Sequence, residues 1–196
     1  MNAAIERDDM AQSLTDFLTE RERAHGNDVA LVYGSESITY SQLAAESRRV
    51  AAGLSKLGVT YGDRVALWLP NVPAWLACFF ACAQLGAIAV TVNTRFRSNE
   101  VADIVGRSGA KVLVLWPDFR HIDFAGILRD VPADSLANLE SIVAYEEGDA
   151  ATTPLLPGRP VIRYGEFARE PEMRESHARP DAGCVIFTTS GTTRAP

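Results

Sequence analysis

An apolar run passes directly into a polar one in the stretch GCVIFTTSGTTRAP, residues 183–196. Its first part, Cys184–Phe187, has the length and composition of a buried β-strand. Six small residues follow, which carry a hydroxyl group or no side chain: Thr188, Thr189, Ser190, Gly191, Thr192 and Thr193. Such a loop exposes backbone N–H groups and hydroxyls with little steric hindrance, so it can hydrogen-bond a phosphate at close range. The stretch therefore predicts a strand that delivers a phosphate-binding loop.

The loop alone does not establish a site, because Ser/Thr/Gly runs are also common in solvated linkers. It is also not the common nucleotide loop GxxxxGK[ST]. That pattern needs two glycines and a lysine, whereas Thr188–Pro196 contains only Gly191. The sequence upstream must therefore decide between a linker and a binding loop.

Upstream, helical and strand patterns alternate along the chain. An amphipathic helix at residues 11–24 and a hairpin of Val29–Tyr33 with Ile38–Tyr40 come first. Six segments follow: a helix over 41–57, a strand over 65–69, a helix over 73–85, a strand over 88–92, a helix that Ser98 caps and Gly109 ends, and a strand over 111–115. This alternation predicts an α/β fold with a layered, largely parallel sheet and helices on both faces.

From Trp116 onward the pattern is weaker. It predicts a helix around Ile122–Leu128 and a strand at Ser141–Ala144, followed by an irregular connection over 145–180 that is rich in proline, glycine and charge.

A membrane-associated protein is an alternative, because no charged residue occurs between Arg64 and Arg95 and Val72–Val92 is long enough to cross a bilayer. Polar residues, proline and glycine interrupt both ends of this stretch, and its last part, Ile88–Val92, is β-branched like a strand. We therefore expect a buried helix followed by a strand, and no membrane span.

Composition excludes further classes. The net charge of −6 argues against nucleic acid as a partner, which needs a basic face. Three cysteines without metal-ligand spacing, Cys78, Cys82 and Cys184, fit a reducing cytoplasm, and the acidic N-terminus has no export signal. The histidines, His25, His121 and His177, are isolated in sequence, so we expect no metal site. The carboxylates Glu146 and Glu147 are expected to be solvated.

The order TTSGTTRAP resembles the phosphate-binding signature of the adenylate-forming superfamily, which includes acyl-CoA synthetases (AMP-dependent ligases), luciferases and the adenylation domains of peptide synthetases. In that family an aromatic residue precedes Thr-Ser-Gly-Thr-Thr-Gly, one variable residue, Pro and Lys. Thr189–Thr193 match, Arg194 stands where glycine is usual, and the sequence stops at Pro196, before the lysine.

Two longer stretches resemble the start of an acyl-CoA synthetase in the same order. They are ITYSQLAAESRRVAAGLSKLGVTYGDRVALWLPN and FFACAQLGAIAVTVNTRFRSNEVADIVGRSGAKVLV. The resemblance covers about residues 29–196. It implies that residues 1–196 are the incomplete N-terminal portion of a large AMP-binding domain, with an irregular connection at 145–180 and a strand plus truncated phosphate-binding loop at 184–196.

For the intact enzyme the resemblance implies an ATP-dependent acyl-CoA ligase, which converts a fatty or aryl acid to an acyl-adenylate and passes the acyl group to CoA. ATP, Mg²⁺ and CoA would take part, and Thr188–Thr193 would hold the phosphates of ATP. The adenine pocket, most of the acyl pocket and the catalytic lysine would follow Pro196. We therefore expect no catalytic residue and no ligase activity within these 196 residues.

Two alternatives remain at this point. One is an adenylation domain that loads a carrier protein, and the other is a non-catalytic binding module that kept the fold. The resemblance also leaves a homo-oligomer open.

Overall fold

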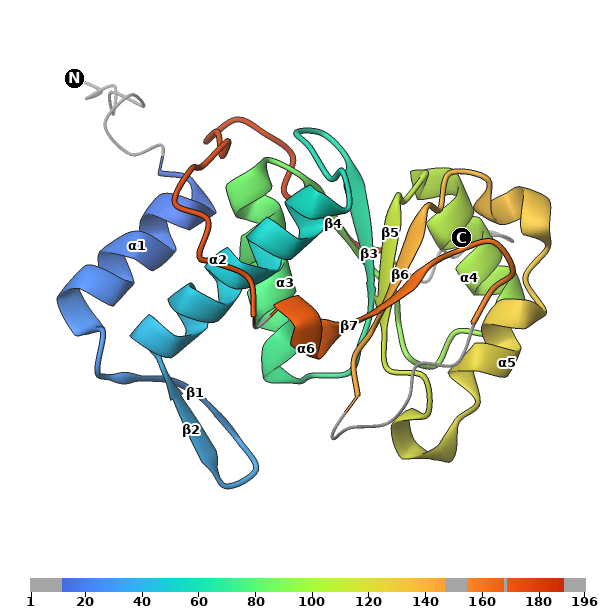
Figure 1. Cartoon of the computed structure of the whole chain (residues 1–196), viewed down its shortest axis with the longest axis horizontal. Helices are drawn as coiled ribbons and strands as arrows, with labels where there is room; N and C mark the ends of the chain where they lie inside the picture. The colour runs from blue at the N-terminus through green and yellow to red at the C-terminus, as the bar shows by residue number, and fades with distance from the viewer. Residues whose placement is uncertain (1–11, 147–154, 168, 189–196) are drawn as a thin grey trace, which may run out of the picture.

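The computed structural model describes residues 12–146, 155–167 and 169–188 of the 196-residue chain. They form a six-stranded sheet and a two-stranded hairpin (Figure 1). The strands are β1 (Val29–Tyr33), β2 (Glu36–Thr39), β3 (Arg64–Trp68), β4 (Ile88–Thr91), β5 (Val112–Leu115), β6 (Ser141–Ala144), β7 (Val161–Arg163) and β8 (Val185–Ile186). The α-helices are α1 (Leu14–His25), α2 (Tyr40–Lys56), α3 (Pro73–Leu85), α4 (Ser98–Ser108), α5 (Phe124–Arg129) and α6 (Tyr164–Phe167). Two short 3₁₀ helices are η2 (Phe119–His121) and η3 (Ala133–Leu136).

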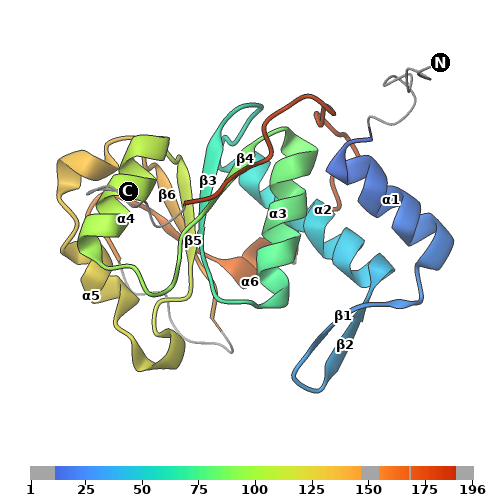
Figure 2. The same ribbon diagram turned by 180° about the vertical axis from the view of Figure 1, so that it is seen from behind.

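The strand order of the main sheet is β7-β6-β5-β3-β4-β8, and every neighbouring pair is parallel. Helices cover both faces, with α2, α3 and α6 on one side and α4 and α5 on the other (Figures 1 and 2). The predicted α/β fold is confirmed.

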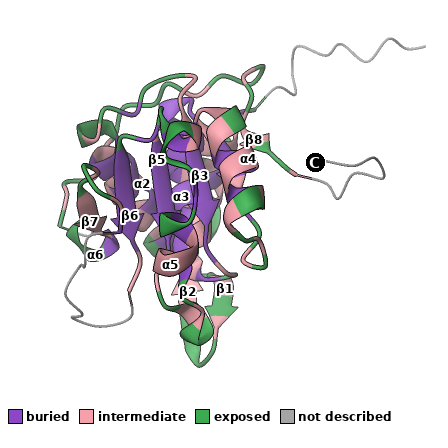
Figure 3. Ribbon diagram, turned by 90° about the vertical axis from the view of Figure 1, so that its right-hand side faces the viewer, coloured by how far each residue is buried: buried purple, intermediate pink, exposed green. Residues whose placement is uncertain are grey.

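Strand residues alternate between two hydrophobic clusters, as the two-residue period of a strand requires. In β3, Val65 and Leu67 face α2 and α3, whereas Ala66 and Trp68 face α4 and α5. All four are fully buried. Figure 3 shows the buried residues concentrated in the central strands and the helices that cover them.

Local sequence signals explain the helix ends. Thr39 and Gln42 form a capping box at the start of α2, in which each side chain accepts a hydrogen bond from the backbone N–H of the other, at 3.2 and 2.8 Å. Pro73 lies in the first turn of α3, where its missing N–H costs nothing. That helix ends at Gly86, whose φ of 66° favours glycine.

The apolar stretch 72–92 therefore divides into a helix of 13 residues and the strand β4, as expected. Among the described residues no helix has both the length and the hydropathy that a membrane crossing needs.

Three expectations need correction. Ser98 is the first residue of α4, and the cap position belongs to Arg97, whose N–H donates to the Glu100 carboxylate at 3.0 Å. The strand predicted at Cys184–Phe187 is not buried: Ile186 is 37% and Phe187 69% exposed, because β8 is an edge strand that pairs only with β4 among the described elements. The connection expected to be irregular over 145–180 contains β7 and α6.

Candidate functional site

An extended segment before β8, residues 170–183, runs along α2 and α3 and positions β8. Glu172 accepts a hydrogen bond from the Nε of Arg48 at 2.7 Å. Gln84, only 5% exposed, donates from its Nε2 to the carbonyl oxygens of Met173 and Glu175 at 2.8 and 2.9 Å. The carbonyl oxygen of Gln84 accepts from the N–H of His177 at 2.7 Å. Gln84, near the end of the apolar helix α3, thus holds the segment at Met173, Glu175 and His177 through its side-chain amide and its backbone carbonyl group.

β8 continues from this segment and adds to the edge of the sheet beside β4. The N–H of Ala89 donates to the carbonyl oxygen of Cys184 at 3.0 Å, and the hydroxyl of Thr91 donates to that of Ile186 at 3.3 Å. Thr188 follows the carboxyl end of the strand. Of the six predicted phosphate-binding residues the structure describes this one, and Thr189–Thr193 lie outside the described residues.

A groove of about 700 Å³ lies at the carboxyl ends of β3, β4, β5 and β8, and Thr188 lines it. The segments that follow these strands form its walls, together with Tyr33 of the hairpin. We call it the arginine groove, because Arg95 and Arg120 are part of its lining.

The topology explains why a groove forms at this point. β3 and β4 are neighbours, but β3 leads into α3 on one face of the sheet and β4 leads into α4 on the other. The two connections diverge and leave a crevice outside the carboxyl ends of the strands, where open α/β sheets bind their ligands.

The turn after β4 is fixed by several hydrogen bonds. The side-chain oxygen of Asn93 accepts from the N–H of Arg95 at 2.9 Å, and its carbonyl oxygen accepts from the N–H of Phe96 at 3.0 Å. The same carbonyl accepts from the indole N–H of the buried Trp68 at 3.1 Å. Trp68 therefore connects the core of the sheet to the wall of the groove.

The sequence analysis singled out neither Arg95 nor Arg120. A signal for Arg95 exists in its place directly after a strand, in the polar segment Asn93–Arg97. No comparable signal marked Arg120, because it lies in a short 3₁₀ helix in the region of weak pattern.

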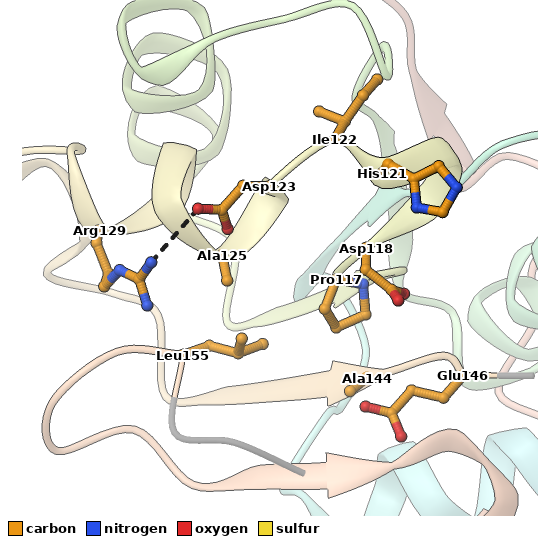
Figure 4. Close-up of a pocket in the computed structure, with 10 residues that line it drawn as sticks. All are labelled: Pro117, Asp118, His121, Ile122, Asp123, Ala125, Arg129, Ala144, Glu146 and Leu155. Atoms are coloured by element: carbon orange, nitrogen blue, oxygen red, sulfur yellow. Dashed lines mark ion pairs between the residues drawn. The ribbon is translucent and has the colours of Figure 1, made fainter. Parts of the chain in front are cut away.

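Two smaller cavities lie at the carboxyl ends of β6 and β7, with volumes of about 380 and 430 Å³. Figure 4 shows the first, where Arg129 forms an ion pair with Asp123 at 3.5 Å. Glu146 lines both cavities, and burial raises the pKa of its carboxyl group, with Arg163 opposing and Asp118 adding to this effect. We call them the acidic pockets, because carboxylates outnumber arginines among their lining residues: Asp118, Asp123, Glu146, Glu166 and Glu170 against Arg129, Arg163 and Arg169.

The structure also shows the surroundings of the cysteines of α3 and of two histidines. Cys78 and Cys82 are fully buried on α3, and burial raises the pKa of the Cys82 thiol to about 12, which makes it unreactive. His25 contacts Asp28 at 2.9 Å, and His121 lines one of the acidic pockets.

Comparisons with known proteins agree with this architecture. The family described as AMP-binding enzyme matches residues 18–196. One relative from Rhodococcus jostii (strain RHA1) is named 3-[(3aS,4S,7aS)-7a-methyl-1,5-dioxo-octahydro-1H-inden-4-yl]propanoyl:CoA ligase. It is 34% identical to this chain over 181 residues. That alignment covers 87% of this chain and 34% of the ligase. Triostin synthetase I from Streptomyces triostinicus is 32% identical over 123 residues, 63% of this chain and 23% of that protein.

Among solved structures, the anthranilate CoA ligase AuaEII in complex with anthranoyl-AMP matches with a TM-score of 0.77 at 27% identity. The match covers 93% of this chain and 33% of the ligase. The chain thus spans about a quarter to a third of the length of these relatives. The fold and the match over residues 18–196 together show that the chain belongs to the family of AMP-binding enzymes.

Proposed function

We propose that the protein is part of an ATP-dependent ligase that activates a carboxylic acid as an acyl-adenylate and transfers the acyl group to CoA. The observation that carries this proposal is the position of Thr188, which lines the groove at the carboxyl ends of the strands. In this proposal residues 1–196 belong to the large N-terminal domain of the enzyme, and Thr188–Thr193 hold the phosphates of ATP.

The groove fits this chemistry because its described lining offers hydroxyl, amide and guanidinium groups and no carboxylate. The reaction must bring together two anions, the acid and the triphosphate, so donors and positive charge are needed and negative charge would oppose it. Magnesium would supply further positive charge at the triphosphate, and the described lining of the groove offers it hydroxyl and amide oxygens but no carboxylate.

Pyrophosphate release tests the activation step. We expect the product of the whole reading frame to release pyrophosphate from ATP with at least one acid from a panel of fatty, aromatic and alicyclic acids. The 196-residue chain alone should release none above background. Absence of release with every acid would contradict the proposed activity, and release by the 196-residue chain would contradict our assignment of the catalytic groups to sequence outside it.

The second candidate function is the loading of a carrier protein, because the name of one relative, triostin synthetase I, does not describe a CoA ligase. The two functions differ in the acceptor thiol. With an acid that supports pyrophosphate release, we expect a CoA thioester detectable by mass spectrometry. Acylation of a phosphopantetheinylated carrier without thioester formation on free CoA would favour the alternative.

A further inference from the structure

The strand β8 is too short to fix its own position on the sheet. Its two residues, Val185 and Ile186, pair with Ala89 and Val90 of β4. The register of a strand is strongly specified where one of its faces is buried, because a slip of one residue turns every side chain to the opposite face. In β8, however, Val185 is only partly buried and Ile186 is 37% exposed. Contacts outside the strand must therefore set its register.

Gln84 supplies such contacts to the segment before β8. Its Nε2 group donates to the carbonyl oxygens of Met173 and Glu175 at 2.8 and 2.9 Å, and its backbone carbonyl oxygen accepts from the N–H of His177 at 2.7 Å. A primary amide has two N–H donors, so this side chain uses its full donor capacity on one segment. Because Gln84 is only 5% exposed, water has little access to replace these hydrogen bonds.

Gln84 also belongs to the part of the chain that carries β4. It lies in the last turn of α3, four residues before β4 begins. The segment before β8 passes over the turn between them (Figure 2), so closely that a Cβ atom on Gly86 would lie 2.9 Å from the carbonyl oxygen of His177. Gln84 thus attaches the segment to the base of the strand on which β8 must align.

The path from Gln84 to β8 has little slack. It runs between two backbone hydrogen bonds, from the N–H of His177 to Gln84 and from the N–H of Ala89 to the carbonyl oxygen of Cys184 at 3.0 Å. A slip of β8 along β4 would have to lengthen or shorten this short span by a whole residue. The attachment at Gln84 therefore opposes the slip.

Two further contacts hold the same span. The N–H of Ala182 donates to the carbonyl oxygen of Arg179 at 3.1 Å and closes a turn. The guanidinium group of Arg179 lies over the ring of Tyr61, 4.8 Å from the ring centre. The span is therefore folded against the body of the domain and cannot change its length without losing these contacts.

We propose that Gln84 is a positioning residue, which sets the register of β8 on β4 and thereby the position of Thr188 in the arginine groove. Gln84 is not among the described lining residues of this groove, so it acts through the segment. A slip of one residue moves a strand by about 3.3 Å, which is more than the length of a hydrogen bond from a hydroxyl group to a phosphate oxygen. The inference rests on the proposed function, in which Thr188 contacts the phosphates of ATP.

Variants in the product of the whole reading frame separate hydrogen bonding from packing. Gln84→Leu removes the donors and keeps a side chain of similar size. Gln84→Glu and Gln84→Lys each bring one charge to the same place, but only the ammonium group can donate to the two carbonyl oxygens. Ile142→Val is the matched control for lost stability, because it removes a buried methylene group from the cluster on the α4–α5 face, away from the segment.

Calorimetric titration measures the Kd of MgATP, and pyrophosphate release gives kcat and the KM values. We expect Gln84→Leu and Gln84→Glu to raise the Kd and the KM for MgATP about tenfold or more, since each lost hydrogen bond corresponds to a factor of about two to ten. The KM for the acid should change less than about twofold, and Gln84→Lys should recover part of the affinity for MgATP.

A merely structural role for Gln84 predicts a different result. Lost stability lowers the amount of folded enzyme and with it the apparent kcat, but the Kd and KM of the remaining folded enzyme do not change. Ile142→Val should behave in this way, with a Kd for MgATP within about twofold of that of the natural protein.

The proposal is overturned if folded Gln84→Leu and Gln84→Glu bind MgATP as tightly as the natural protein, if Gln84→Lys binds no better than Gln84→Glu, or if the natural protein does not bind MgATP. The comparison of Gln84→Glu with Gln84→Lys decides the question even if Gln84→Leu does not fold. Binding of MgATP that depends on Gln84, without pyrophosphate release for any acid, would remove the proposed function and leave the positioning role. Pyrophosphate release with an unchanged KM for MgATP in these variants would do the reverse.

Discussion

The two halves of the carboxyl edge of one sheet differ in charge. At β3, β4, β5 and β8 the arginine groove carries two arginines and no carboxylate among its described lining residues. At β6 and β7 the acidic pockets carry five carboxylates and three arginines, partly paired with one another. Both halves offer concave space at the same edge, so the presence of a cavity alone does not choose between them. The charges do, and they favour the arginine groove for an anionic ligand.

The difference begins with the connections. The arginine groove opens where the chain leaves β3 and β4 toward opposite faces of the sheet. The acidic pockets follow β6 and β7, which lie at the other end of the strand order, where α6 is a helix of only four residues. A topological crevice thus coincides with positive charge in one half only.

The largest effect is expected from Trp68→Ala, because this residue supports both halves. Its ring packs edge-on against Phe124 at 4.7 Å, and its N–H holds Asn93 in the wall of the groove. Removing a fully buried tryptophan should lower the free energy of unfolding by about 3–5 kcal/mol. Urea unfolding measures the loss.

Trp68→Phe is the companion variant, because it keeps most of the packing and removes the N–H. We expect it to cost about 1–2 kcal/mol, including the unmade hydrogen bond to Asn93. A loss below about 1 kcal/mol for Trp68→Ala would show that the two halves do not depend on this residue.

An intermediate effect is expected from Gln84→Leu, which acts on one half only. The change removes the two hydrogen bonds to the segment before β8, and each contributes about 0.5–1.5 kcal/mol. Hydrogen exchange of residues 184–188 should become about tenfold faster, whereas β6 in the acidic half serves as the internal control and should not change. Equal acceleration in both regions would contradict a local role for Gln84.

The prediction of the fold from sequence succeeded where the signals were local and repeated. The periodicity of residues 41–115 indicated the helices α2, α3 and α4 and the strands β3, β4 and β5, and Gly58, Gly86 and Gly109 mark helix ends with positive φ. β7 and α6 were missed because three and four residues are too few for a period to show. The exposure of β8 was missed because an apolar run has the same composition at the edge of a sheet as in its centre.

The candidate site was predicted only in part. The sequence singled out Thr188, which lines the groove, because hydroxyl and glycine residues follow a strand directly. It could not identify Arg120, which joins the same groove only through the parallel pairing of β3 with β5. Arg95 and Arg120, which are 25 positions apart in the sequence, reach the same groove through the sheet, and no local pattern encodes such an arrangement.

The smallest effect is expected from Glu146→Gln in the acidic half. Burial raises the pKa of this carboxyl group in the fold, so the folded chain favours the protonated form. The stability that this group contributes is therefore present below the pKa of the unfolded chain and is lost as the pH rises through the higher folded value. We expect the variant to have a higher Tm than the natural protein at about pH 7 and no gain at about pH 4.

Glu36→Gln in the hairpin is the control for this effect, because it removes the same charge from an exposed side chain. It should show no gain that grows with pH. If Glu146→Gln gave its gain at low pH instead, the account of the acidic pockets would be wrong. Nucleotide binding in the arginine groove should be unaffected by either variant.

The most direct test compares the two halves in one experiment. Amide chemical shifts of the isotopically labelled protein can be followed during titration with a non-hydrolysable ATP analogue and, separately, with CoA. We predict the largest shift changes at residues 91–96, 119–120 and 187–188, which surround the arginine groove. Changes concentrated at residues 144–146 and 163–166 of the acidic pockets, or no changes with either ligand, would contradict the claim that this groove binds the nucleotide.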